Sequence, residues 1–382
     1  MRIGFIGPFC TSYNSDYGSE RQVGAIEQQF FGIAKGLMDI GHEVVITRNW
    51  SGKGTESAVE GVRLLNVNTF SNSGQGFSNS RFPHNRVSYL LYLLNAPKRL
   101  VKCDLDIVCT TGILQSWISL KAIKRTPAKR VFIANNNDVF IEKGVGHTRT
   151  PFITEKMFRI VNREYHATVA ITNGLKEYLK GVEMRCDDVI PNAVEPAEYS
   201  CGKSGSFILT ASRLVPHKRI EQLIQVYCER MRDTVQDLVV IGSGPCEKAL
   251  KQSAASKCKG DRIKFLPFLP QSEYRRYLSD CSLFVLPSEA ETFGVVILEA
   301  MACSKPVIAR NTIGPKDIIT NNHDGVLFSN LDELEEQMTR LLSDDSLRQT
   351  MGRKARETVE ASYTFKQVAA QYGELFESLV KN

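Results

Sequence analysis

The chain has 382 residues, 42% of them hydrophobic and 24% charged, which is the composition of a soluble protein long enough for two domains. It contains no run of eighteen apolar residues, and its first strand-like residues are too few for a signal peptide, so we expect no membrane span and a cytoplasmic location. The net charge of +6 divides into +7 for residues 1–190 (24 Lys and Arg, 17 Asp and Glu) and −1 for residues 191–382 (24 and 25), which indicates either an anionic partner for the first half or an unremarkable basic surface.

The first half alternates short apolar strands with helix-like stretches. Strands are predicted at "RIGFIG", "HEVVIT", "VRLLNV", "LDIVCT", "RVFIAN" and "ATVAIT", and an amphipathic helix from about Ile26 to Ile40. Residues 70–86 are rich in Ser, Asn and Gly and are predicted to form a mobile loop. Repeated strand-then-helix alternation is typical of a parallel sheet with helices on both faces.

Residues 191–206 interrupt the alternation with prolines, glycines and serines, which predicts a linker. Strands are then predicted at "FILTAS", "DLVVIG", "RIKFLP", "SLFVLP", "PVIAR" and "GVLFS", with helices between them. We therefore expect an α/β protein of two doubly wound, Rossmann-like domains, residues 1–190 and 207–363. The last helix, residues 364–382, is expected to pack back on the first domain.

The apolar stretch Val295–Ala302 contains a glutamate, Glu299, and a buried glutamate needs a partner. The helix is predicted to begin near Thr292, where free N–H groups, including those of Phe293 and Gly294, favour an anion such as a phosphate. Glu299 would lie about 10 Å further along the helix axis. Its carboxylate could there accept hydrogen bonds from both hydroxyls of a ribose, and the alternative is an ion pair with a Lys or Arg.

Charged residues also follow two other predicted strands. Glu291 lies on the loop before the Glu299 helix and could accept hydrogen bonds from a sugar hydroxyl. Arg213 and Lys218 are five residues apart after "FILTAS", a spacing that allows both side chains to converge on one diphosphate. Most such Arg–Lys pairs are simply solvated, but a strand end is where parallel sheets bind ligands.

Small residues mark a further strand end. Gly242 and Gly244 flank Ser243 in "VVIGSGP", where they either let a ligand approach the backbone or form a tight turn. Gly7 follows the first strand, but its surroundings do not form the GxGxxG pattern of a dinucleotide site.

Taken in order, "GHEVVI", "IPNAVE", "SRLVPHK", "IGSGP" and "ETFGVVILE" make the chain similar to the glycosyltransferase family 4 proteins of the GT-B fold. The resemblance covers nearly the whole chain and is densest in residues 207–328. "ETFGVVILE" matches the family's two glutamates separated by seven residues, and "SRLVPHK" matches its Arg–Lys diphosphate motif. "VGAIEQQFFGIAKGLMDIGHEV" aligns with its first Gly-rich turn and helix.

The resemblance implies two domains facing across a cleft and a retaining transfer of a sugar from a nucleotide-diphosphate donor without a metal or other cofactor. It assigns Glu291 to the donor sugar and Glu299 to the ribose. The remaining donor-binding residues that it implies are Arg213, Lys218, Gly242, Ser243, Thr292, Phe293, Gly294 and, from the first domain, Gly24.

One departure affects catalysis. The family commonly has a His after the strand that corresponds to "RVFIAN", whereas here the stretch is "NNND", Asn135 to Asp138. An Asn can form hydrogen bonds but cannot exchange protons near neutral pH. Either Asn137 or Asp138 substitutes as a catalytic residue, or catalysis is weaker than in relatives. The missing His also gives weight to a catalytically silent subunit that binds a nucleotide sugar or a partner transferase. A nucleotide-sugar epimerase or hydrolase is a further alternative.

The partners that we expect are a UDP-sugar, with a GDP-sugar as the alternative, and a hydroxyl of a glycan, lipid-linked or small-molecule acceptor, as in the synthesis of bacterial surface polysaccharides. No nucleic acid partner is expected. The ten cysteines include no CxxC pair and suit a reducing compartment better than a disulfide framework or a zinc site. "DLD", Asp104 to Asp106, resembles a metal-binding motif of other glycosyltransferases but begins a strand, and the six histidines show no ligand spacing.

A leucine-rich stretch precedes a run of cations in the first half. In residues 89–102, four leucines between positions 90 and 94 are followed by Lys98, Arg99 and Lys102, and five further cations lie between residues 121 and 130. A basic surface with apolar residues can lie on anionic lipid without crossing it. The alternative is that the leucines form core and the cations a solvated face.

Overall fold

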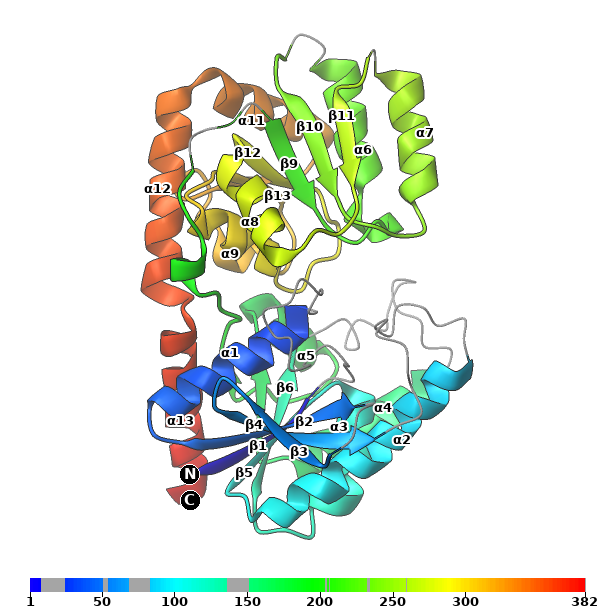
Figure 1. Cartoon of the computed structure of the whole chain (residues 1–382), viewed down its shortest axis with the longest axis vertical. Coiled ribbons are helices and arrows are strands. Elements are labelled where there is room, and N and C mark those ends of the chain that lie inside the picture. Colours follow the sequence, from blue (N-terminus) through cyan, green and yellow to red (C-terminus); the bar gives the residue numbers. More distant parts are fainter. Residues whose placement is uncertain are drawn as a thin grey trace. The chain divides into compact units, whose positions relative to one another are not determined.

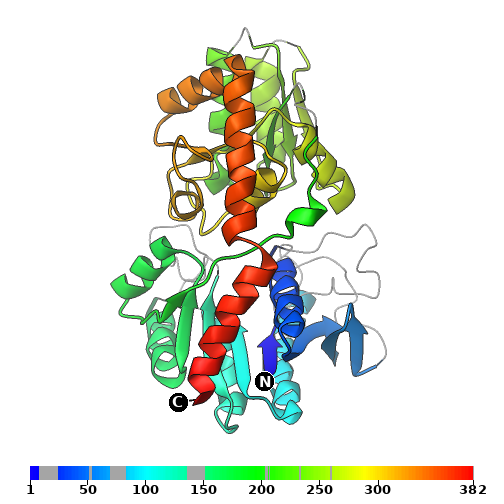
Figure 2. The same ribbon diagram turned by 90° about the vertical axis from the view of Figure 1, so that its left-hand side faces the viewer.

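The computed structural model describes residues 1–7, 25–50, 54–68, 83–135, 151–202, 205, 207–231, 234–258 and 260–381. The chain forms two compact units (Figures 1 and 2). The first unit consists of Met1–Ala193 with Phe365–Asn382, and the second of Val194–Thr364. Among the helices of the described ranges, none combines the length and the apolar character that crossing a membrane requires.

An eight-stranded sheet forms the centre of the first unit, in the order β3-β4-β2-β1-β5-β6-β7-β8. Its strands are β1 (Arg2–Ile6), β2 (Glu43–Trp50), β3 (Glu56–Val59), β4 (Val62–Asn68), β5 (Ile107–Thr111), β6 (Lys129–Ala134), β7 (Ala167–Ala170) and β8 (Asp188–Val189). Neighbouring strands are parallel except β3 and β4, which are antiparallel. Strand β3 was not predicted, because the four residues of this edge strand are not buried and carry little apolar signal.

Helices cover both faces of this sheet. They are α1 (Ala25–Asp39), α2 (Pro83–Leu100), α3 (Ile113–Ile123), α4 (Pro151–Glu164), α5 (Asn173–Gly181) and α13 (Phe365–Lys381). Alternate strand residues face opposite sides, so Ile3 and Phe5 pack in one core with α1 and α13, which lie side by side (Figure 2). Gly4, between them, faces Leu100 of α2 on the other side.

The second unit contains a fully parallel six-stranded sheet, in the order β11-β10-β9-β12-β13-β14. Its strands are β9 (Phe207–Ala211), β10 (Asp237–Ile241), β11 (Ile263–Leu266), β12 (Leu283–Leu286), β13 (Val307–Arg310) and β14 (Val326–Phe328). The chain proceeds outward from β9 to β11 and then returns to place β12 on the other side of β9. The expected α/β class with two largely parallel sheets is confirmed.

The helices of the second unit follow its strands in turn. They are α6 (Ile220–Gln225), which continues as a π-helix (Val226–Arg230), α7 (Glu247–Lys257), α8 (Gln271–Asp280), α9 (Val295–Ala302), α10 (Pro315–Ile318), α11 (Leu331–Ser343) and α12 (Asp345–Ser362). Short 3₁₀ helices span Pro196–Glu198 and Pro216–Lys218.

Two local expectations need correction. Helix α2 begins at Pro83, so the last four residues of the predicted 70–86 loop are helical, and proline is favoured in a first turn because its missing N–H has no helical partner there. Cys228 and Cys258 form a disulfide with a Cα–Cα distance of 4.9 Å, whereas the cysteine usage was expected to suit a reducing compartment better than a disulfide framework. Thirty residues separate these cysteines in sequence, and only packing brings them together.

Candidate active site

The predicted donor-binding residues of the second unit gather where its strand order reverses. The loops that follow β9 and β12 leave neighbouring strands at the same edge of the sheet. Open parallel sheets bind ligands outside the carboxyl ends of their strands at such a switch point. The site is therefore defined by the segments 212–219 and 287–294, which follow these two strands.

Lys218 and Glu291 form an ion pair at this point. The distance from Lys218 Nζ to Glu291 Oε2 is 2.5 Å, and each side chain is only 14% exposed. A cation for a diphosphate and a carboxylate for a sugar hydroxyl are thus in contact, 73 residues apart in sequence. Because water screens this pair poorly, each charge stabilises the other.

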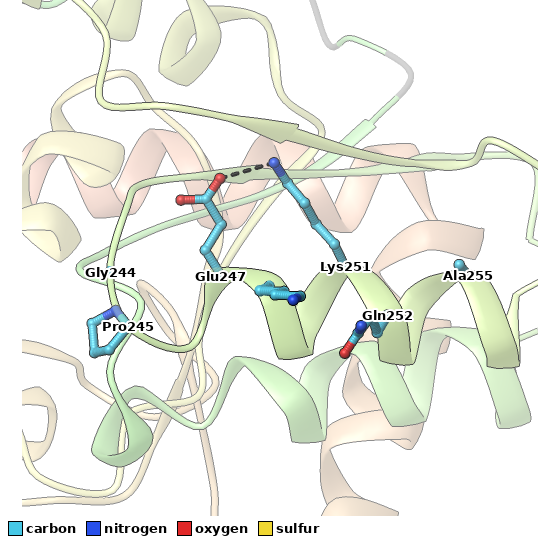
Figure 3. A pocket seen from close by; sticks show the side chains of 7 residues that line it. Gly244, Pro245, Glu247, Lys251, Gln252 and Ala255 are labelled. Carbon is cyan, nitrogen blue, oxygen red and sulfur yellow. Dashed lines mark hydrogen bonds and ion pairs between the residues drawn. The ribbon is translucent and has the colours of Figure 1, made fainter.

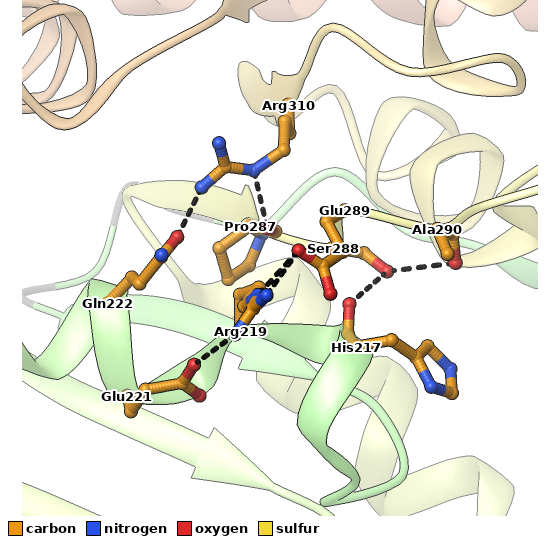
Figure 4. A network of polar contacts seen from close by, with 9 residues as sticks. All are labelled: His217, Arg219, Glu221, Gln222, Pro287, Ser288, Glu289, Ala290 and Arg310. Carbon is orange, nitrogen blue, oxygen red and sulfur yellow. Dashed lines mark hydrogen bonds and ion pairs between the residues drawn. The ribbon is translucent and has the colours of Figure 1, made fainter. Parts of the chain in front are cut away.

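Further contacts fasten the two loops to each other (Figure 4). The N–H of Glu289 donates to the carbonyl oxygen of His217 at 3.0 Å, and Arg219 pairs with Glu289 at 2.6 Å. On the other side, Arg310 Nε donates to the carbonyl oxygen of Pro287 at 3.0 Å. This network holds the residues on both sides of Lys218 and the loop segment that precedes Glu291.

Arg213 is exposed at the end of β9, and its guanidinium forms no ion pair with another described residue. Burial, followed by the positive charges of Lys218 and Arg213, lowers the pKa of His217, so this imidazole is neutral at pH 7. Figure 4 shows the ring pointing away from the loop network. Lys218 and Arg213, the cations of the predicted diphosphate motif, are thus both close enough to His217 to lower its pKa.

The glycines after β10 have a structural explanation. A Cβ atom at Gly242, where φ is +147°, would lie 1.9 Å from the carbonyl oxygen of Ser212, and one at Gly244 would lie 2.3 Å from that of Leu214. The N–H of Leu214 donates to the carbonyl oxygen of Ser243 at 3.0 Å. The space beside both glycines is therefore filled by the loop that carries Arg213.

The start of helix α9 differs from the prediction. The helix begins at Val295, three residues after Thr292, because Gly294 precedes it with φ +95° in the left-handed region. The half-buried Thr292, the buried Phe293 and Gly294 therefore lie before the first helical residue. The backbone of Gly314 approaches that of Phe293 so closely that a Cβ there would be 2.5 Å from the Phe293 nitrogen. This crowds the Phe293 amide, whereas Gly294 borders Glu291 directly.

Glu299 is buried in α9, with 6% of its surface exposed, and two tyrosines satisfy it. Tyr274 Oη donates to Glu299 Oε2 at 2.9 Å, and Tyr199 Oη donates to Oε1 at 3.3 Å. The alternative of an ion pair with Lys or Arg is wrong, since no such pair forms between described residues. Burial raises the pKa of Glu299, and the two tyrosine hydrogen bonds act in the opposite direction.

Three predicted residues, Gly24, Asn137 and Asp138, lie outside the described residues. Asn135 is described: its Oδ1 accepts a hydrogen bond of 2.5 Å from Thr111 Oγ1. Both residues lie at the carboxyl ends of adjacent strands, Asn135 after β6 and Thr111 at the end of β5.

The "DLD" carboxylates contact Arg2. Asp104 pairs with its guanidinium at 2.6 Å, and Asp106 accepts its backbone N–H at 2.7 Å. These acidic side chains thus anchor the first strand. In the ranges that the structure describes, no three His, Cys, Asp or Glu residues are grouped as metal ligands.

A shallow depression of about 620 Å³ runs along helix α7 (Figure 3). It is lined by Gly244, Pro245, Glu247, Lys248, Lys251, Gln252 and Ala255. Its Lys251–Glu247 pair, at 2.8 Å, is one helical turn apart and exposed. The depression contains none of the predicted donor-binding residues, and we do not assign the site to it.

Tyr199 and Tyr274 are the contacts of Glu299 that sequence reasoning missed. They lie 100 and 25 residues from it in the chain. A tyrosine in a helix or linker is usually a packing residue, and no spacing rule connects these positions. Only the tertiary structure brings them to the carboxylate.

The two α/β units, each built on a largely parallel sheet, have the fold of GT-B glycosyltransferase structures. Residues 196–358 match the model of the family described as glycosyl transferases group 1. Sucrose-phosphate synthase from Thermosynechococcus elongatus has a similar structure, with a TM-score of 0.80 and 18% identity over 99% of both chains. Anabaena HepE in complex with UDP gives a TM-score of 0.74 and 16% identity, over 99% of this chain and 100% of that one.

Among curated relatives, the N-acetyl-alpha-D-glucosaminyl L-malate synthase of Bacillus anthracis is 28% identical over 187 residues. The alignment covers 48% of this chain and 49% of that protein, so the chain spans about half the length of this relative.

Proposed function

We propose that the chain is a retaining glycosyltransferase that moves a sugar from a nucleotide-diphosphate donor to an acceptor hydroxyl. The observation that carries the proposal is the Lys218–Glu291 ion pair at the switch point of the second unit. It joins a cation suited to a diphosphate and a carboxylate suited to a sugar hydroxyl. A UDP-sugar is the preferred donor, since HepE, a structural relative, was solved with UDP.

The mechanism follows from where negative charge grows. As the glycosidic bond to the nucleotide breaks, the leaving diphosphate gains charge, which Lys218 and Arg213 stabilise without a metal. Glu291 accepts a hydrogen bond from a hydroxyl of the donor sugar and so holds the sugar ring in place. The acceptor hydroxyl attacks from the face that the diphosphate leaves, and this retains the configuration at the anomeric carbon.

The test incubates the purified chain with UDP- and GDP-sugars, with and without sugar, glycan and lipid-linked acceptors, and measures nucleotide release. Release that requires an acceptor supports a transferase. Release without one identifies a hydrolase. Tight donor binding without turnover under every condition identifies a silent subunit, and absence of nucleotide binding overturns the proposal.

A second part of the proposal is that helices α2 and α3 contact anionic lipid, with a lipid-linked acceptor delivered there. The leucines divide between two environments: Leu93 is buried, whereas Leu90 and Leu94 are 51% and 43% exposed. On the adjacent α3, Leu114 and Trp117 are each 40% exposed. The expectation that all the leucines form core is therefore wrong for Leu90 and Leu94.

The charge of this segment suits anionic lipid. Residues 83–135 contain nine Lys and Arg and two Asp, a net charge of +7 that equals the whole excess of the N-terminal half. Both aspartates are engaged by Arg2. Lys98 follows Leu94 by four residues and Lys121 follows Trp117 by four, so cations extend each exposed apolar stripe by about one helical turn.

We expect the chain to sediment with vesicles of anionic lipid at low salt and to be released at high salt, since the screening length falls from about 10 Å at 0.1 M to about 3 Å at 1 M. The double variant Lys98→Glu, Lys121→Glu should lose most of this binding. A matched control, Lys248→Glu with Arg353→Glu, reverses two exposed cations of the second unit and should bind like the parent. A parent chain that stays in the supernatant at low salt would leave a soluble acceptor as the better proposal.

A further inference from the structure

The carboxylate of Glu299 is held from two sides by side chains of different segments. Tyr274 comes from the first turn of α8, and Tyr199 directly follows the 3₁₀ helix Pro196–Glu198. Each tyrosine donates to a different carboxylate oxygen, at 2.9 and 3.3 Å. The orientation of the Glu299 carboxylate is thereby fixed before any ligand binds.

Two arginines restrict the position of Tyr199. The guanidinium of Arg275 lies over its ring at 5.0 Å and pairs with Glu198. Arg356, from helix α12, donates to the carbonyl oxygen of Tyr199 at 2.8 Å. A cation over an aromatic face and a charged donor on the backbone each restrict the ring, so its hydroxyl is held toward Glu299.

We propose that Tyr199 and Tyr274 are positioning residues that present Glu299 as a fixed acceptor for the two ribose hydroxyls of the donor. This inference rests on the proposed function. An ionised carboxylate has about four acceptor positions and no donor. Two are used by the tyrosines, one on each oxygen, and the two that remain match the two hydroxyl donors of a ribose.

Several groups act on the pKa of the Glu299 carboxylate. Burial raises the pKa of Glu299, while the hydrogen bonds from Tyr274 and Tyr199 and the charge of Arg275 lower it. The other charged or titratable groups nearby are Glu198, the thiol of Cys303 after α9, and Arg356 of α12. Burial and the carboxylate raise the pKa values of both tyrosines, which therefore remain donors.

Loss of the hydroxyl group of Tyr199 or Tyr274 should therefore affect Glu299 in two ways. The carboxylate can turn away from the ribose, and its pKa rises further, because a stabilising hydrogen bond to the charged form is gone. A protonated carboxyl group has fewer acceptor positions. As the pH is lowered, each variant should therefore lose its nucleotide affinity at a higher pH than the parent does.

The experiment measures Kd for UDP, GDP and their 2′-deoxy forms by calorimetry between about pH 5 and pH 8, on the full chain and on Tyr274→Phe and Tyr199→Phe. Each variant should bind the ribose form about five- to tenfold more weakly at neutral pH. The preference for ribose over deoxyribose should shrink, and the pH midpoint of binding should move upward. Tyr277→Phe is the matched control: this tyrosine is on the same helix but packs on Phe207, and it should match the parent.

Thermal unfolding establishes that each variant is folded, and a Glu299→Gln background supplies an independent measurement. In that background Tyr274→Phe should change the ribose preference no further. Variants that keep the parent's ribose preference and pH midpoint overturn the positioning role, while a parent that prefers ribose still supports the proposed function. A parent that binds neither UDP nor GDP overturns both.

Discussion

Lys218→Ala is expected to lower kcat/KM for the nucleotide-sugar donor by about 100- to 1000-fold, the range found when one preorganised donor to a developing negative charge is removed. The Lys218 side chain is 14% exposed, so water cannot readily replace its ammonium group. Steady-state kinetics with the preferred donor and acceptor provides the measurement. The loss should appear in kcat as well as in KM, because charge on the diphosphate grows during the reaction.

The same change leaves Glu291 without its ion partner. We expect the free energy of unfolding to fall by about 1–3 kcal/mol, because a mostly buried carboxylate then lacks a counter-charge. In the double variant Lys218→Ala, Glu291→Gln, part of this stability should return while activity stays low. Activity close to that of the parent in Lys218→Ala would remove this residue from the site.

Two other cations serve as comparisons. Arg213→Ala should cost about tenfold in donor affinity and turnover, the lower end of the range for one charge-assisted contact, since this side chain is exposed. Lys251→Ala removes a cation of an exposed helical pair beside the α7 depression and should leave kcat/KM unchanged. A large effect of Lys251→Ala would instead move the site to that depression.

Glu299→Gln is expected to weaken nucleotide binding by about tenfold to a hundredfold, which corresponds to the loss of charged hydrogen bonds worth about 1.5–3 kcal/mol. A 2′-deoxyribose nucleotide should lose less affinity in the variant than the ribose form does, since it has one fewer hydroxyl to present. Calorimetric titration of both nucleotides measures the difference. Equal losses for the two would make Glu299 a structural residue.

The ionisation of Glu299 that supports nucleotide binding should lower the free energy of unfolding of the parent. The folded-state pKa of Glu299 is raised above the ordinary value of 4.5, so the unfolded chain releases this proton first, and ionisation of Glu299 disfavours the fold. Relative to Glu299→Gln, the parent should therefore lose stability as pH rises through 4.5 toward the folded-state pKa. Denaturant unfolding at several pH values provides the check, and a parent that gains stability over this interval would contradict it.

The position of helix α9 illustrates how sequence reasoning is limited at helix ends. The apolar run Val295–Ala302 correctly predicted a buried helix, and its bounds agree with the structure. The start of the helix was nevertheless predicted near Thr292, three residues before this run. Gly294 adopts the left-handed conformation, which glycine enters without steric cost, and the helix begins only at Val295.

The glycines of "IGSGP" show a different limit. Their spacing fits both a ligand site and a close approach of two chain segments. No feature of the sequence distinguishes these two explanations. The backbone of residues 212–214 fills the space beside Gly242 and Gly244. The segment that fills it begins thirty residues earlier in the chain, so the distinction depends on how β9 and β10 pair.

The sequence by itself determined the α/β alternation, the strands whose ends carry Arg213, Lys218 and Glu291, and the burial of Glu299. These follow from periodicity and from the rule that parallel strands place their carboxyl ends at one edge, which are local or short-range properties. Only the tertiary structure decided that Lys218 and Glu291 are paired, that two tyrosines satisfy Glu299, and that Cys228 meets Cys258. The physical reason is that hydrogen bonds, ion pairs and disulfides act over a few ångströms between residues 25 to 100 positions apart, and chain folding alone sets those distances.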